Sequence, residues 1–152
     1  MFVTNAIDDQ PLPLYGDGRY RRDWLAVDDH CAGIEHVLSQ GQPGTIYNVG
    51  GGNEKENLTV AELILHCLDK PKSLIRLVTD RPGHDRRYAI DCSRLRGLGW
   101  QPKVSFEEGI RTTVEWYRTH EAWWKKIKSG EFRTYYEQMY SRRLQEGRAC
   151  GS

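Results

Sequence analysis

The chain has 152 residues, a length that suits one domain or part of one. Its 22 Lys and Arg residues nearly balance 21 Asp and Glu residues, for a formal net charge of +1, which argues against a nucleic-acid-binding surface. No segment approaches the roughly 20 consecutive apolar residues of a membrane span, and the amino terminus has no signal-peptide pattern. We therefore expect a cytoplasmic protein with neither a nucleic acid nor a membrane as its partner.

The four cysteines form no CxxC pair, and no histidine lies beside them at the spacing of zinc ligands. They are Cys31, Cys67, Cys92 and Cys150. This pattern predicts free thiols in a reducing compartment and no metal site.

The first part of the chain alternates helical and extended patterns. Residues 1–7 look like the inside of an amphipathic helix with no capping residue before it. Residues 11–15 predict an extended run, because each proline restricts itself and its predecessor. A turn at the sequence GDG leads to a predicted buried strand over residues 23–27 and a helix over residues 28–41. The caps expected for this helix are Asp28 or Asp29 and Gly41, and its expected apolar face is Cys31, Ile34, Val37 and Leu38.

The second part continues the alternation. Residues 45–52 predict a second buried strand that ends in glycines, residues 60–70 a helix, and residues 74–78 a third strand. Residues 92–100 predict a short helix, and residues 106–127 a long one. Two capping boxes are expected, Thr59 with Glu62 and Ser105 with Glu108.

This order predicts an α/β fold with a narrow, partly parallel sheet and flanking helices. Three strands leave two exposed sheet edges, and the first helix lacks a beginning. Both features favour the second part of a larger fold that starts at an internal methionine. We divide the chain into a folded portion, residues 1–128, and a polar, aromatic helical tail, residues 129–152, that packs on the surface or frays.

Polar and aromatic side chains gather near the ends of the extended segments, where open α/β sheets bind ligands. Tyr15 ends the first extended run, Arg22 directly precedes the predicted strand, and Asn57 lies just before a helix. Arginine presents planar, paired donors to phosphate oxygens, and a tyrosine ring offers a face to a base. This set predicts a site for a nucleotide diphosphate.

Structural roles are alternatives for the same residues. Arg22 also suits a local ion pair with its neighbour Asp23, and Tyr15 suits a half-buried packing position. The glycines at 50–52 also suit a simple strand end.

The sequence RPGHDRRY, residues 81–88, places five chargeable side chains among eight residues. Pro82 and Gly83 prevent a regular helix or strand there. A run of charge is usually solvated, but one held by Pro-Gly has a shape to keep. We therefore interpret this loop as an anion site.

The chain resembles the carboxyl-terminal part of dTDP-glucose 4,6-dehydratase, an enzyme of the extended short-chain dehydrogenase/reductase (SDR) group. The similar segments cover nearly the whole chain in order: LPLYGDG, RDWLAVDDHCAGI, YNVGGGNEKENLTV, RPGHDRRYAID, LGWQPKVSFEEGIRTTVEWY and YYEQMY. GGGNEKENL and RPGHDRRYAID are specific to this branch, whereas RDW and YNVG are shared with other nucleotide-sugar epimerases and dehydratases.

The resemblance implies the substrate-binding carboxyl-terminal portion of an extended SDR fold, without its amino-terminal Rossmann half. It implies that Arg22 holds the diphosphate of dTDP or a dTDP-sugar and that Asn57 contacts the nucleotide. The segment implied to pack on the base and ribose is Pro13, Leu14 and Tyr15. The loop implied to close over the diphosphate and ribose is Arg81, Pro82, Gly83, His84 and Asp85.

The complete enzyme, by the same resemblance, uses NAD to convert dTDP-glucose to dTDP-4-keto-6-deoxyglucose. It oxidises the sugar at C4, eliminates water across C5 and C6, and returns the hydride to C6. No tyrosine here is followed four residues later by lysine, and no GxGxxG fingerprint is present. We therefore expect no catalytic residue in this chain and no NAD bound to it alone.

Four interpretations remain open at this point. The chain is an inactive nucleotide-sugar-binding portion of the dehydratase, a subunit of a split enzyme completed by a Rossmann partner chain, a stand-alone nucleotide-diphosphate-binding module, or a remnant without function. UDP- and GDP-sugars are alternatives to the dTDP-sugar.

Overall fold

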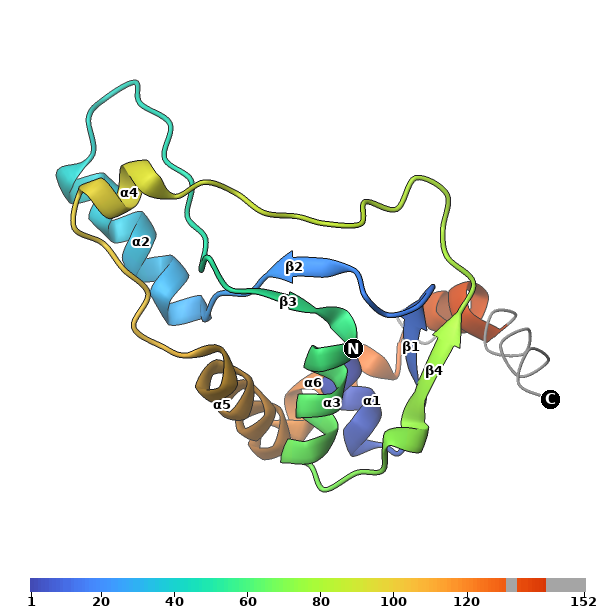
Figure 1. Cartoon of the computed structure of the whole chain (residues 1–152). Helices are drawn as coiled ribbons and strands as arrows, with labels where there is room; N and C mark the ends of the chain where they lie inside the picture. The colour runs from blue at the N-terminus through green and yellow to red at the C-terminus, as the bar shows by residue number, and fades with distance from the viewer. Residues whose placement is uncertain (131–133, 142–152) are drawn as a thin grey trace.

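The structure is a computed structural model, and it describes residues 1–130 and 134–141 (Figure 1). Residues 134–141 are helical. The other elements, in chain order, are α1 (Phe2–Ile7), β1 (Leu12–Tyr15), β2 (Arg21–Asp23), α2 (Val27–Gln40), β3 (Glu54–Glu56), α3 (Asn57–Cys67), the 3-10 helix η1 (Lys72–Leu74), β4 (Ile75–Val78), α4 (Ser93–Gly97), α5 (Phe106–Thr119) and α6 (Glu121–Lys128).

Two short sheets confirm the expected α/β class with a narrow, partly parallel sheet. β1 pairs in parallel with β4, from Leu12 opposite Ile75 to Tyr15 opposite Val78. Parallel neighbouring strands need a long crossover connection. The connection from β1 to β4 contains α2 and α3. β2 pairs antiparallel with β3 as a separate two-stranded ribbon.

The hydrophobic core lies where β1 meets α1, α3 and α5. Leu12 and Leu14 of β1 are almost fully buried, as is Leu65 of α3. On α5, Phe106 and Val114 are eight residues apart and therefore share the buried face of the helix. This core fixes the position of β1 and β4, whose carboxyl ends carry the candidate site.

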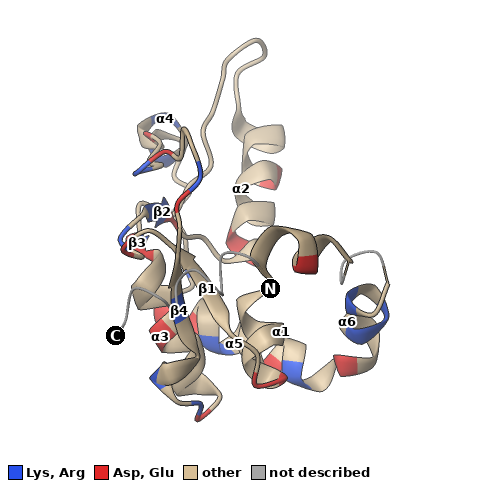
Figure 2. Ribbon diagram, turned by 90° about the vertical axis from the view of Figure 1, so that its right-hand side faces the viewer, with Lys and Arg blue, Asp and Glu red and all other residues tan. Residues whose placement is uncertain are grey.

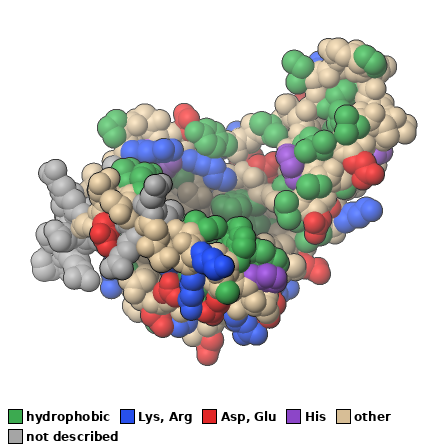
Figure 3. Space-filling model, turned by 180° about the vertical axis from the view of Figure 1, so that it is seen from behind, with side chains coloured by type: hydrophobic (Ala, Val, Ile, Leu, Met, Phe, Trp, Pro, Cys, Tyr) green, Lys and Arg blue, Asp and Glu red, His purple; other side chains and the backbone are tan. Residues whose placement is uncertain are grey.

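The molecule has a body and a projecting lobe. α1, α3, α5 and α6 gather with β1 and β4 in the body, while α2 and α4 lie side by side at one end (Figure 1). Residues 79–92 run as an extended segment from the end of β4 to the lobe. Figure 3 shows the lobe standing out from the body, with hydrophobic side chains on its surface and in the hollow beside it.

Both predicted buried strands of the lobe side were wrong. β2 ends at Asp23, so residues 24–26 are outside any strand, and residues 45–52 contain none. Ile46 is 77% exposed. An apolar run becomes a strand only where a neighbouring strand completes its backbone hydrogen bonds, and the described residues place none beside this segment.

The expected caps at the starts of two helices were also wrong, whereas Gly41 is the C-cap of α2, as expected. α3 begins at Asn57, so Thr59 and Glu62 lie inside it and form no capping box. The cap position of α2 is Ala26. Asp29 instead turns inward and accepts hydrogen bonds from the backbone N–H groups of residues 103 and 104, at 3.0 and 2.9 Å. A buried carboxylate needs such donors, and this contact ties α2 to the loop before α5.

The cap at Ser105 is confirmed, because its Oγ accepts a hydrogen bond from the Glu108 N–H at 3.2 Å. The long helix predicted after it is two helices, α5 and α6, which meet at His120. His120 Nδ1 lies 2.8 Å from the Trp116 carbonyl oxygen. The same oxygen accepts the backbone N–H of His120 at 3.0 Å, so this residue holds the end of α5 through both its backbone and its side chain.

Free thiols are found at Cys31, Cys67 and Cys92, while Cys150 lies outside the described residues. Within 1–130 and 134–141, no group of three His, Cys, Asp or Glu side chains is placed to hold a metal ion. The described helices include none that is long and apolar enough to cross a membrane.

Candidate functional site

Arg22 lies at the centre of the candidate site. It belongs to β2, and its Nη2 hydrogen-bonds with His84 Nε2 at 3.0 Å and with the Asp85 carbonyl oxygen at 3.1 Å. Its Nη1 donates to the carbonyl oxygen of Arg21 at 2.6 Å. The guanidinium carbon lies 4.2 Å from the centre of the Tyr88 ring, a cation–π distance. The structure therefore joins Arg22 to the loop of residues 81–88.

His84 is the buried centre of this loop. Its side chain is 5% exposed, and its ring stacks on Tyr20 at 4.0 Å between centroids. The ring also makes a T-shaped contact with Tyr15, at 5.4 Å between centroids. Gly83 before it has a φ of +68°, which glycine adopts without strain. The loop thus has a defined shape, as its Pro-Gly pair predicts.

Asp80 holds the other side of the His84 ring. His84 Nδ1 lies 2.7 Å from Asp80 Oδ1, which also accepts the Arg81 N–H at 2.8 Å. Partial burial acts to raise the pKa of Asp80, but these hydrogen bonds outweigh it and hold the pKa below its usual value. Asp80 lies two residues after the end of β4, so its place near the carboxyl end of a strand was the signal that could have found it.

Two arginines of the loop are committed to ion pairs. Arg86 makes two hydrogen bonds to Asp17, at 2.8 and 2.7 Å. Arg87 makes two to Glu54, at 2.6 and 2.5 Å. Figure 2 shows basic and acidic residues side by side around β2 and β3. Arg81 differs, because its guanidinium has no partner in the described part of the chain.

The alternative of an Arg22–Asp23 ion pair was wrong. The Asp23 carboxylate instead accepts the backbone N–H groups of Gly52 and Asn53, at 3.1 and 2.7 Å. A Cβ added at Gly51 would lie 2.4 Å from the Trp24 carbonyl oxygen. The glycines therefore permit a close backbone approach that anchors β2, rather than only ending a strand.

The other sequence-predicted residues lie at different places. Pro13 and Leu14 are buried inside β1, and Tyr15 at its end is partly exposed, with its hydroxyl 3.3 Å from that of Tyr140. Asn57 is the first residue of α3, and its N–H donates to the Tyr20 carbonyl oxygen. No contact between described residues joins the Asn57 side chain to Arg22 or His84.

A pocket of about 530 Å³ opens beside Arg22. Arg22 and Tyr88 contribute to its lining together with Trp24, Val49 and Ile90. The buried Trp24 Nε1 has no hydrogen-bond partner among the described residues. Buried donors usually have one. Sequence reasoning missed Tyr20, Tyr88 and Asp80, which shape the surroundings of Arg22.

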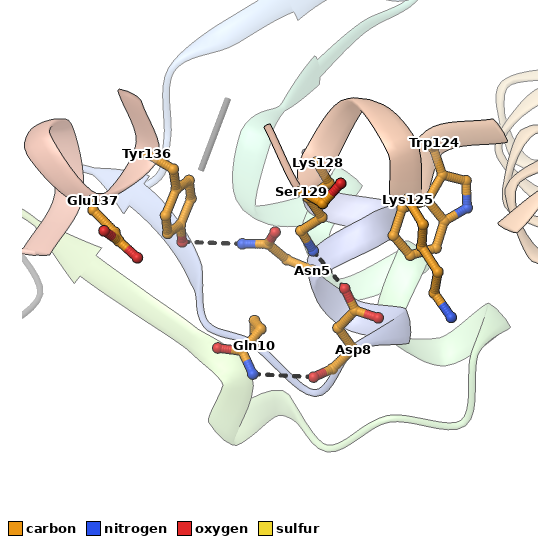
Figure 4. Close-up of a pocket in the computed structure, with 9 residues that line it drawn as sticks. All are labelled: Asn5, Asp8, Gln10, Trp124, Lys125, Lys128, Ser129, Tyr136 and Glu137. Atoms are coloured by element: carbon orange, nitrogen blue, oxygen red, sulfur yellow. Dashed lines mark hydrogen bonds and ion pairs between the residues drawn. The ribbon is translucent and has the colours of Figure 1, made fainter. Parts of the chain in front are cut away.

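A second pocket, of about 670 Å³, lies on the body between α1, α6 and residues 134–141 (Figure 4). Its lysines are paired, Lys128 with Asp8 at 2.7 Å and Lys125 with Glu121. Asn5 donates to the Tyr136 hydroxyl at 3.0 Å. None of the sequence-predicted site residues lines this pocket.

The residues present do not fit NAD. A dinucleotide site needs a glycine-rich turn that leads from a strand into a helix. Here the turn GDG connects β1 to β2, and the glycines at 50–52 lead to β3. We therefore derive no hydride-transfer step from this chain.

Comparisons with known proteins agree with the resemblance expected from the sequence. The chain is 48% identical to a dTDP-glucose 4,6-dehydratase of Xanthomonas campestris over 88% of its own length and 41% of the relative. The NAD complex of the dTDP-glucose 4,6-dehydratase of Bacillus anthracis superposes with a TM-score of 0.79 at 51% identity, over 84% of this chain and 40% of that one.

DesIV of Streptomyces venezuelae, a dTDP-glucose 4,6-dehydratase solved with NAD and TYD bound, superposes equally well at 47% identity, covering 84% of this chain and 40% of that one. The chain thus spans about two fifths of the length of these relatives. A family model described as GDP-mannose 4,6 dehydratase matches residues 1–113. The chain therefore belongs to the GDP-mannose 4,6 dehydratase family.

Proposed function

We propose that this chain is the nucleotide-sugar-binding portion of an NAD-dependent dTDP-glucose 4,6-dehydratase and is inactive alone. The observation that carries the proposal is the orientation of Arg22, which the loop after β4 holds beside an open pocket. The likeness to dTDP-glucose 4,6-dehydratases supports the choice of substrate. The complete enzyme would convert dTDP-glucose to dTDP-4-keto-6-deoxyglucose.

Arg22 has the donors that a diphosphate needs. An arginine side chain carries five N–H groups, and three of them serve Arg21, His84 and Asp85. The other two have no partner among the described residues. Arg81 lies on the loop after β4, and its guanidinium also has no hydrogen-bond or ion-pair partner among the described residues. It supplies a second cation. Charge-assisted hydrogen bonds to phosphate are the strong ones.

Calorimetric titration of the chain with dTDP, with UDP for comparison, tests this proposal. We expect Arg22→Ala to weaken dTDP binding roughly 10- to 100-fold, because one charged hydrogen-bonding group is worth about 1.5–3 kcal/mol. Arg81→Ala is expected to weaken it in the same direction. The matched control is Arg111→Ala, which removes an exposed arginine of α5 with no described partner.

Three results would contradict the proposal. A folded wild-type chain that binds no dTDP lacks the nucleotide site, and equal binding by wild type and Arg22→Ala would place the site elsewhere. Turnover of dTDP-glucose by the pure chain would show that it is not inactive alone.

A second candidate function is a subunit of a split enzyme, completed by a Rossmann partner chain that binds NAD. The apolar face of α2 favours it, because Ile34 is 45% and Leu38 83% exposed. A face with the pattern of a buried helix, left open, suits a partner surface. Restored dehydratase activity on mixing with such a partner is the test.

A further inference from the structure

The two ring nitrogens of His84 contact side chains of opposite charge. Its Nε2 lies 3.0 Å from Arg22 Nη2, and its Nδ1 lies 2.7 Å from Asp80 Oδ1. A guanidinium has only donors, so Nε2 must be the acceptor. The ring is then neutral and carries its proton on Nδ1, where the Asp80 carboxylate accepts it.

We propose that Asp80 and His84 are positioning residues that fix the Arg22 guanidinium in the orientation in which it meets an anionic ligand. Asp80 selects the ring tautomer, and the free lone pair on His84 Nε2 holds Arg22. This inference rests on the proposed function for the identity of the ligand, a nucleoside diphosphate. The arrangement of the three side chains does not depend on that identity.

Burial and packing hold the His84 side chain in one position. With 5% of its side chain exposed, it stacks on Tyr20 and makes a T-shaped contact with Tyr15. Both ring nitrogens already have partners, so the side chain has no atom left to offer a ligand. Its role is therefore exerted through Arg22.

Two backbone carbonyl oxygens also accept hydrogen bonds from Arg22. That of Arg21 belongs to the neighbouring residue, and that of Asp85 comes from the same loop as His84. Of these three acceptors, His84 is the side chain. The His84 contact links β2 to the loop after β4, 62 residues away. An arginine that is already ordered loses less freedom on binding its ligand.

The first measurement is the ring ¹⁵N chemical shifts of His84 in the whole chain without ligand. We expect the pattern of a neutral ring protonated at Nδ1, and its loss in Asp80→Ala. Asp80→Asn keeps an oxygen acceptor and is expected to retain the tautomer. A ring protonated at Nε2 in the wild-type chain would overturn the proposal.

The second measurement is calorimetric titration with dTDP. His84→Phe keeps a ring to stack on Tyr20 but removes the acceptor, and we expect about 5- to 10-fold weaker binding, the effect of losing one pre-ordered side chain. His84→Gln offers an amide oxygen to Arg22 and is expected to rescue most of the affinity. Binding by His84→Phe within twofold of wild type would overturn the proposal.

The two measurements separate this inference from the proposed function. If the wild-type chain binds no dTDP but shows the Nδ1–H tautomer that Asp80→Ala abolishes, the proposed function fails and the positioning of Arg22 stands. If dTDP binds and the tautomer is the other one, the proposed function stands and the positioning role fails.

Discussion

Among single residues, ion pairs separate the arginines in and beside the loop at 81–88 into two groups. Arg86 and Arg87 each face a carboxylate from another part of the chain. Arg81 forms no ion pair and no side-chain hydrogen bond with a described residue, and Arg22 contacts a histidine and backbone oxygens. The division follows from contacts between segments far apart in sequence, which no local pattern reveals.

The Arg86–Asp17 pair is expected to make stability depend on pH. The two hydrogen bonds from Arg86, together with the Arg19 N–H, lower the pKa of Asp17 to about 2, below the ordinary value of about 3.9. A lowered pKa in the folded state adds stability above the unfolded value, and this is lost as pH falls through the folded value. We expect wild type to exceed Asp17→Asn in stability at pH 7, by an amount that shrinks between about pH 4 and pH 2.

Urea unfolding of both proteins over this pH range measures the difference. Because the pair is exposed on both sides, the effect at pH 7 is expected to be small. Glu35→Gln, on the exposed surface of α2, is the matched control that removes an unpaired carboxylate. A difference between wild type and Asp17→Asn that stays constant with pH would contradict the expectation.

At the same scale, the sequence predicted part of the candidate site. The Pro-Gly loop and Arg22 were identified because arginine and left-handed glycine have chemical signatures of their own. Asp80 and Tyr20 were not, since their importance comes from their contacts with His84. Patterns find residues with a special chemistry more readily than the residues that orient them.

Among the elements, helices were predicted better than strands. The apolar period of α3 and α5 is complete within each helix, so each helix can be predicted from its own segment of the sequence. A strand depends on a neighbouring strand, which cannot be identified from the local sequence. Residues 45–52 have a strand composition but no neighbouring strand in the described chain, and they are irregular.

Ser105 and Thr59 were both expected to cap helices, and Thr59 now serves as the control for Ser105. Ser105 caps α5 through a hydrogen bond to the Glu108 N–H. Ser105→Ala is expected to lower the free energy of unfolding by about 1 kcal/mol, and Ser105→Asp to retain most of it. Thr59 lies exposed inside α3 without a capping bond, so Thr59→Ala should change stability by less than about 0.5 kcal/mol. Denaturation in urea measures all three, and equal losses for Ser105→Ala and Thr59→Ala would contradict the cap.

For the molecule as a whole, the lobe leaves several large hydrophobic side chains exposed. Val27 and Leu38 of α2 are 71% and 83% exposed. Ile46, in the segment that follows α2, is 77% exposed. The parallel pair of β1 and β4 has no further strand among the described residues. Parallel sheets are normally covered on both faces and continue to more strands. The chain also spans about two fifths of its relatives' length, so these surfaces suit contact with a nucleotide-binding half.

Complementation tests this interpretation. The chain is mixed with the part of the Bacillus anthracis dehydratase that it does not cover, together with NAD and dTDP-glucose, and formation of the 4-keto sugar is measured. We expect activity that neither part has alone, because we propose that the added half supplies the NAD site and the catalytic groups. Leu38→Glu is expected to lower the activity at least 10-fold, since a charge cannot be buried unpaired in an apolar contact.

Ile127→Glu is the matched control, because Ile127 of α6 is 54% exposed but lies on the body, away from the lobe. It should leave complementation within about twofold of wild type, since it introduces the same charge on a face that the interpretation leaves in solvent. Equal losses in both variants would mean that a general effect on stability, and not the lobe, controls assembly. Activity that survives Leu38→Glu unchanged would place the contact surface on the open edges of β1 and β4 instead.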